Sequence, residues 1–98
     1  MSYPIVFRRV AWAEYDDSIQ WYEDRSPGLG SKFETRMESL LDLIAEHRDR
    51  YPLIRRDIRQ APVHGFPYSA YYRVRSGRVV VVSVFHESRD PKEWQARS

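Results

Sequence analysis

The strongest constraint on the fold is an apolar run near the carboxyl end of the chain, Val79–Phe85. Five of its seven residues are valine, whose branched side chain favours strands. An unbroken run of this kind indicates a strand that is buried on both faces, inside a sheet. We therefore expect the rest of the chain to build a sheet around it. The run leads directly into a polar segment, His86–Asp90, so core residues and candidate functional residues share one stretch of chain.

Three more strands are predicted from alternating apolar and polar residues. Residues 66–75 alternate throughout, and Ser76-Gly77 suits the two-residue connection of a hairpin. This strand should therefore pair antiparallel with residues 78–85. Residues 57–63 predict a weaker, more polar strand, and residues 3–9 predict the first strand of the chain.

Between the first strand and the others, apolar residues recur with the period of an amphipathic helix. One helix is predicted over residues 11–25, where a segment rich in glycine and proline, residues 26–30, ends it. A second helix follows and ends near residues 48–51, just before a proline. Its start has two candidates: Ser26 before a proline, or Ser31 with a glutamate three residues later as a capping box.

The predicted order is β-α-α-β-β-β, followed by a short C-terminal helix that starts near residues 90–93 and carries Trp94. This order predicts an α+β fold in which a helical hairpin packs on one face of a mainly antiparallel four-stranded sheet. The other face of the sheet is expected to be left to solvent or to a partner. The length of the chain leads us to expect one domain over residues 1–98.

Charge is unevenly distributed along the chain. Residues 1–54 hold seven basic and ten acidic side chains, a balance of −3, whereas residues 55–98 hold nine basic and four acidic ones, a balance of +5. A basic second half, nearly all arginine, indicates an anionic partner, either nucleic acid or an acidic protein segment. The alternative is a solvated arginine-rich surface without a partner, and composition does not separate the two.

Cysteine is absent, which excludes disulfides and thiolate metal sites and is compatible with a reducing cytosol. The amino-terminal residues show no secretion or transit signal, and the longest apolar run is too short to span a bilayer. We therefore expect a cytoplasmic protein without a membrane partner. No phosphate-binding glycine loop occurs, and no cofactor is expected.

Two groups of side chains are candidates for function. His86 lies near carboxylates and could act as a general base, although a histidine that satisfies the backbone of a strand-to-helix turn is the favoured interpretation. The histidines are far apart in sequence, so no metal site is predicted. In the second group, arginines and Tyr71 gather on one side of the sheet, where they could hold phosphates and stack bases, or only discourage aggregation. These arginines are Arg55, Arg56, Arg59, Arg73, Arg75, Arg78 and Arg89.

Several short motifs occur in a recognisable order along the chain. In the second half they are Phe66-Pro67-Tyr68, Tyr71–Val74, Val79–Phe85, His86, Arg89-Asp90-Pro91 and Trp94. In the first half they are Trp21-Tyr22-Glu23, Pro27–Gly30 and Phe33. This order resembles the RelE/ParE superfamily, the toxins of type II toxin–antitoxin systems that are often labelled plasmid-stabilisation proteins. The resemblance covers essentially the whole chain and implies the same β-α-α-β-β-β fold.

The resemblance implies one of two activities. RelE-like members are ribosome-dependent ribonucleases that cut mRNA with basic residues on the sheet and a C-terminal aromatic residue, whereas ParE-like members lack that set and poison DNA gyrase. Aligned without gaps on residues 72–74, the strand lysines of the nucleases fall on Gln60 and Pro62, and their strand arginine falls on Ser69. Trp94 stands near the position of a catalytic tyrosine but cannot exchange a proton. These departures favour the ParE-like activity.

The first hypothesis is therefore a ParE-like toxin without enzymatic activity, held inactive by a cognate antitoxin whose acidic C-terminal segment folds onto a basic toxin face. Its predicted binding residues, for target or antitoxin, are Arg59, Tyr71, Arg73, Arg78, Arg89 and Trp94. The second hypothesis is a RelE-like mRNA endonuclease. Under this hypothesis Arg89 matches the arginine beyond the last strand, and a gap of one or two residues in the alignment places Arg59 or Arg73 at a position of the nuclease cations. Its candidate catalytic residues are Arg89, Arg73 and His86. The third is a non-toxic family member that only binds antitoxin.

Overall fold

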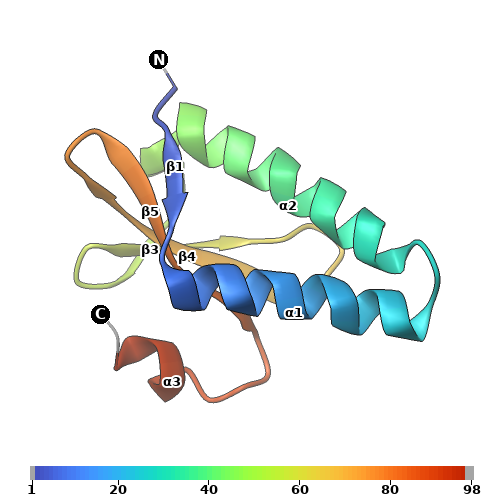
Figure 1. The fold of residues 1–98 in the computed structure, drawn as a ribbon. Coiled ribbons are helices and arrows are strands. Elements are labelled where there is room, and N and C mark those ends of the chain that lie inside the picture. The colour runs from blue at the N-terminus through green and yellow to red at the C-terminus, as the bar shows by residue number, and fades with distance from the viewer. Residues whose placement is uncertain (1, 97–98) are drawn as a thin grey trace.

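The chain forms a five-stranded sheet with a helical hairpin on one face and a short helix against the other (Figure 1). The computed structural model describes residues 2–96. In chain order the elements are β1 Ile5–Phe7, α1 Arg9–Arg25, α2 Leu29–Glu46, the 3-10 turn η1 Arg48–Arg50, β2 Leu53–Arg55, β3 Ile58–Pro62, β4 Tyr68–Arg75, β5 Arg78–His86 and α3 Lys92–Gln95. The predicted α+β fold is confirmed. Within residues 2–96, no helix combines the length and the apolar character that a membrane span requires.

β5 is the strand predicted from the valine run, and it lies inside the sheet as expected. The strand order is β1-β5-β4-β3-β2, so β5 pairs in parallel with β1 and antiparallel with β4. Its side chains enter two cores. Val79, Val81 and Val84 pack under the helices, whereas Val82 and Phe85 pack on the other face. Burial on both faces explains why the run has no polar alternation.

The sheet has five strands rather than the four predicted, because Leu53–Arg55 forms an additional edge strand, β2. β2 pairs antiparallel with β3 through a tight turn in which Arg56 has a φ of 54°. All of β2 is exposed, so it lacks the apolar alternation that identifies a half-buried strand. β1 is also shorter than predicted, since it ends at Phe7 and α1 already begins at Arg9.

The connection between α1 and α2 is fixed by glycine and by one carboxylate, and neither predicted N-cap is correct. α2 begins at Leu29, after Gly28 adopts a left-handed backbone with a φ of 89°. The Glu23 carboxylate of α1 accepts hydrogen bonds from the N–H groups of Gly28 and Gly30, each at 3.0 Å, in place of an N-cap side chain. A Cβ on Gly30 would lie 2.6 Å from the Ile19 carbonyl oxygen, so this close approach of the helices requires glycine.

The main core lies between the helical hairpin and the sheet and is rich in aromatic rings. Phe33 of α2 packs edge to face against Phe66 and Tyr68, with ring centroids 5.0 and 5.3 Å apart. Tyr72 of β4 is fully buried and donates its hydroxyl hydrogen to the Arg48 carbonyl oxygen at 2.6 Å. This burial raises the pKa of Tyr72 to about 12. The ring therefore ties the sheet to η1 as a neutral phenol.

α1 also closes the part of the β5 edge that the short β1 leaves uncovered. The Glu14 carboxylate of α1 accepts hydrogen bonds from the Val84 N–H at 3.1 Å and from the Ser83 hydroxyl at 3.0 Å. Ser83 is fully buried, so its hydroxyl serves the packing of α1 on the sheet.

Candidate interaction surfaces

The arginines in the second half of the sheet are largely paired within the chain. Asp57, in the turn between β2 and β3, lies 3.3 Å from Arg73 and accepts two hydrogen bonds from Arg75, at 3.0 and 3.1 Å. Arg59 of β3 donates to the Tyr51 carbonyl oxygen at 2.6 Å. Arg73 is only 8 % exposed, so it belongs to the interior of the fold rather than to an open surface.

The Asp57 carboxyl joins two of these arginines, and its pKa lies below the ordinary value. Burial on its own would raise the pKa of Asp57, but the hydrogen bond from Arg75 and the charge of Arg73 outweigh that effect. The carboxylate is therefore ionised at neutral pH. Arg73 shares this carboxylate with Arg75 and is itself buried, which leaves its guanidinium less available to an anionic ligand.

Tyr71 and Trp94 pack against each other on the sheet face opposite the hairpin. Their rings stack with centroids 4.3 Å apart and an interplanar angle of 27°. Trp94 is 2 % exposed and Tyr71 6 % exposed, and both belong to the second core with Ile58, Val82 and Phe85. The expectation that this sheet face is open is therefore wrong for the part that α3 covers. The sequence could not show this, because the contact joins residues from distant segments.

Of the three positions where the resemblance places nuclease cations, Gln60 and Ser69 form an uncharged cluster with Tyr71, and the third is Pro62. Gln60 donates its side-chain amide to the Ser69 hydroxyl and to the Tyr71 hydroxyl, both at 3.2 Å. Ser69 is fully buried, and Tyr71 lies under Trp94. This cluster can donate and accept hydrogen bonds, but it brings no positive charge to a phosphate.

The three candidate catalytic residues do not form one site. In the β4–β5 pair, Arg73 lies opposite Val80 whereas His86 lies opposite Tyr68, so the two are separated by about 20 Å along β5. Arg89 forms an ion pair with Glu93 at 2.6 Å. His86 Nδ1 accepts a hydrogen bond from the Ser88 backbone N–H at 3.1 Å, as expected for a histidine that satisfies a turn.

The predicted binding residues differ in how far they can reach a partner. Arg59, Tyr71, Arg73 and Trp94 are buried or partly buried, and they mainly serve the fold. Arg78 and Arg89 are exposed, one at the start of β5 and the other just beyond its end. Partner binding by these six residues stays a prediction, and the exposed Arg89 is its most direct test.

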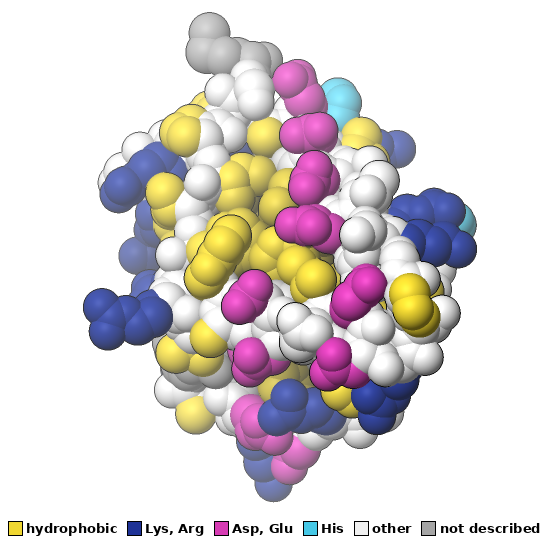
Figure 2. Space-filling model, turned by 45° about the vertical axis from the view of Figure 1, so that its right-hand side comes forward, with side chains coloured by type: hydrophobic (Ala, Val, Ile, Leu, Met, Phe, Trp, Pro, Cys, Tyr) yellow, Lys and Arg dark blue, Asp and Glu magenta, His cyan; other side chains and the backbone are white. Residues whose placement is uncertain are grey.

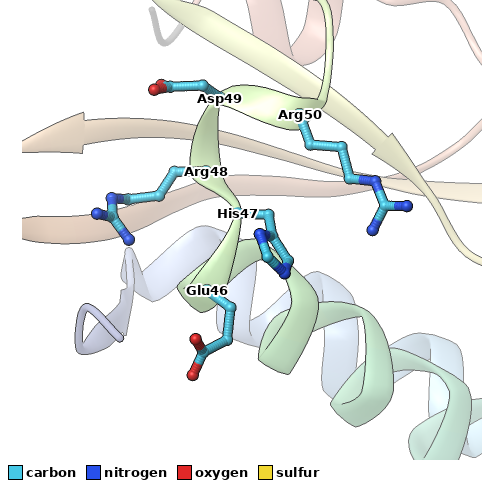
Figure 3. A pocket seen from close by; sticks show the side chains of 5 residues that line it. All are labelled: Glu46, His47, Arg48, Asp49 and Arg50. Carbon is cyan, nitrogen blue, oxygen red and sulfur yellow. The ribbon is translucent and has the colours of Figure 1, made fainter. Parts of the chain in front are cut away.

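Two further hollows lie beside α2. The hollow at the end of α2, about 570 Å³ in volume, is formed by Glu46–Arg50. Figure 3 shows that these five side chains point in different directions rather than toward a common centre. Arg48, for example, stacks on the Tyr3 ring at 3.4 Å and donates to the Ala45 carbonyl oxygen at 2.7 Å. The other hollow, about 420 Å³, lies between α2 and the end of β3 near His64 and shows no cluster of reactive groups.

Within the part of the chain that the structure describes, no three histidine, aspartate or glutamate side chains lie close enough to hold a metal ion.

An apolar groove between β1 and α2 was not predicted from the sequence. It has a volume of about 500 Å³. Apolar and aromatic side chains line it, and acidic side chains of α2 border it (Figure 2). Its lining includes Tyr3, Ile5, Phe7, Trp12, Glu38, Leu41 and Asp42. The regular spacing of acids along α2 was the available sequence signal, but the apolar half of the groove comes from a different part of the chain.

The fold, with two helices between the first strand and the others, is the one that the resemblance to RelE/ParE-like toxins implies. Comparison with protein families narrows this to one family, since the ParE toxin of the type II toxin–antitoxin system parDE matches residues 5–91. The chain belongs to the ParE toxin family. The resemblance found in the sequence is thereby confirmed.

Comparison with solved structures agrees with this assignment. A chain from the chromosomal ParDE toxin–antitoxin system of P. aeruginosa superposes with a TM-score of 0.75. The match covers 87% of this chain and 96% of that chain, at 16% sequence identity. At this identity the likeness supports the fold alone. No match was found among curated proteins.

Proposed function

We propose that this protein is the toxin of a toxin–antitoxin pair, which arrests growth by poisoning DNA gyrase in the cytoplasm and is neutralised by a cognate antitoxin. Membership of the ParE family supports the toxin role. Gyrase is proposed as the target because the sequence resembles the ParE-like members of the superfamily, which poison DNA gyrase. The protein would act by binding, without cleaving RNA itself.

The observation that carries this proposal is the uncharged cluster of Gln60, Ser69 and Tyr71. A ribonuclease of the RelE type must orient the 2′-hydroxyl of RNA and stabilise phosphate charge with positioned cations. Here the corresponding positions carry the amide of Gln60, the ring of Pro62 and the hydroxyl of Ser69, and Trp94 covers the neighbouring ring of Tyr71. The nearest buried cation of β4, Arg73, is paired with Asp57. These features favour a binding toxin over a nuclease.

A supercoiling assay with purified gyrase tests the proposed target. We expect micromolar protein to inhibit supercoiling and to accumulate cleaved DNA, since a poison traps the enzyme on its substrate. Unchanged supercoiling at that concentration would refute the gyrase proposal. In parallel, translating ribosomes with the added protein should show no cleavage of mRNA. Cleavage that Arg89→Ala abolishes would instead establish the nuclease activity.

Expression in growing cells separates a toxin from a non-toxic family member. We expect growth arrest on induction, and relief of that arrest when the antitoxin from a neighbouring reading frame is expressed together with it. Normal growth at a verified protein level would refute the toxin role. The same experiment identifies the antitoxin as the neighbouring gene product that restores growth.

A further inference from the structure

The groove between β1 and α2 leaves apolar side chains exposed at the edge of the sheet. β1 is an outer strand, and no other strand of residues 2–96 covers its free edge. Trp12 is 55 % exposed and packs edge to face on Phe7, with ring centroids 5.2 Å apart, so the indole forms a wall of the groove. Leu41 of α2 lines the opposite side. An exposed hollow of this character is typical of a surface that another chain covers.

α2 borders this groove with one row of acidic side chains. They stand four residues apart, so they follow one line along the helix, and two of them line the groove itself. All four are exposed, and none forms an ion pair with a basic side chain among residues 2–96. Figure 2 shows acidic side chains beside the apolar patch. The row consists of Glu34, Glu38, Asp42 and Glu46.

The negative charge of this row acts on Tyr15, a tyrosine directly behind the groove wall. Tyr15 stacks on Phe7, with ring centroids 5.8 Å apart. Burial raises the pKa of Tyr15, and the carboxylates of Glu34 and Glu38 raise it further. One cation, Arg48, lies over the ring of Tyr3, but it is held there by its own contacts with the chain. An occupant of the groove therefore meets apolar surface with one fixed cation, Arg48, beside Tyr3, and exposed carboxylates along α2.

We propose that the groove binds an amphipathic helix of the antitoxin, whose apolar stripe is flanked by lysine or arginine at intervals of three or four residues. A helix alongside α2 repeats its side chains at the same intervals as the acidic row, about 6 Å per four residues, so each carboxylate can meet a cation. The proposal rests on the proposed function, since it names the chemistry of the antitoxin segment. It replaces the expected acidic segment, because Arg59, Arg73, Arg75 and Arg89 already have carboxylate partners, whereas within residues 2–96 the acidic row of α2 has no basic partner.

Titration with two synthetic peptides tests the groove directly. Both are helical and about as long as α2, with one leucine stripe; the first carries lysine beside the stripe and the second carries glutamate at the same positions. By calorimetry, we expect the lysine peptide to bind at least about tenfold more tightly. Amide NMR shifts should map to β1 and α2. Equal affinities, shifts on the arginine side of the sheet, or a peptide bound as an added strand would overturn the proposal.

Charge reversal provides the matched variants. The double variant Glu38→Lys, Asp42→Lys should bind the lysine peptide about tenfold more weakly and bind the glutamate peptide more tightly than the unmodified protein does. The control, Asp17→Lys with Asp24→Lys, makes the same change of charge at exposed positions of α1 that do not line the groove. We expect the control to retain at least half of the affinity. Similar losses in both variants would show that only net charge matters, which would overturn the proposal.

Growth assays distinguish failure of this proposal from failure of the toxin role. The Glu38→Lys, Asp42→Lys variant should still arrest growth, and the antitoxin should no longer relieve the arrest. If the antitoxin relieves it as fully as for the unmodified protein, the groove proposal is wrong and the toxin role stands. If the unmodified protein does not arrest growth, the toxin role is wrong whatever the peptides show.

Discussion

Glu23 replaces an N-cap side chain for α2, so one residue of α1 determines where the next helix begins. We expect Glu23→Ala to lower the free energy of unfolding by about 1–2 kcal/mol, because the N–H groups of Gly28 and Gly30 lose their acceptor. Urea denaturation followed by circular dichroism measures the change. Asp17→Ala, exposed on the same helix, is the control and should change it by less than about 0.5 kcal/mol. Equal effects of the two variants would contradict the capping role.

Asp57 makes the stability of the fold depend on pH. Its pKa is lower in the folded chain than in the unfolded one, so its stabilising effect is present above about pH 4 and is lost as the pH falls through the folded pKa. We expect the protein to be more stable than Asp57→Asn at pH 7, and the difference in stability to disappear once the pH has fallen below the folded pKa of Asp57. Thermal unfolding of the two proteins across this range of pH measures both stabilities. A constant difference at every pH would show that the charge of Asp57 contributes nothing.

α3 is a four-residue helix, too short to be stable alone, and Trp94 attaches it to the sheet. We expect Trp94→Ala to lower the free energy of unfolding by about 3 kcal/mol, because it removes a large buried ring from the stack on Tyr71. Lys92→Ala, exposed on the same helix, should change it by less than about 0.5 kcal/mol. Chemical denaturation compares the two. A small effect of Trp94→Ala would mean that α3 is dispensable for the second core.

The acidic row also affects the stability of α2 itself. Like charges four residues apart destabilise a helix by about 0.2–0.5 kcal/mol per pair. Glu38→Lys turns two repulsive pairs, with Glu34 and Asp42, into attractive ones, so we expect it to raise the free energy of unfolding by about 1 kcal/mol at low salt. The gain should shrink as salt screens the charges. A variant that is less stable at low salt would show that Glu38 stabilises the fold, although it forms no ion pair within residues 2–96.

The sequence predicted those elements whose pattern is local. The valine run identified β5, the alternation identified β4, and the helical period identified α1 and α2. β2 was missed because an exposed three-residue strand depends on β3 for its hydrogen bonds and carries no pattern of its own. The start of α2 was missed because its capping group lies in another helix. Local periodicity does not contain such information.

The candidate site was harder to predict, because each of its features depends on contacts between distant segments. Arg73 was expected on a surface, but the strand pairing brings Asp57 to it. The groove likewise combines β1 with α2, which are separated in the chain by the whole of α1. The family resemblance indicated the class of function, whereas the chemistry of a partner follows only from the folded surface.

At the scale of the whole molecule, the groove and Arg89 lie in different places, the first between β1 and α2 and the second beside α3. If the groove takes the antitoxin and Arg89 takes part in binding the target, the two functions should separate by mutation. Arg89→Ala should weaken gyrase inhibition about tenfold and leave binding of the lysine peptide unchanged. The Glu38→Lys, Asp42→Lys variant should inhibit gyrase as the unmodified protein does and bind the lysine peptide more weakly. Supercoiling and calorimetry on the same preparations measure both, and a variant that loses both activities while still folded would show that one surface serves both partners.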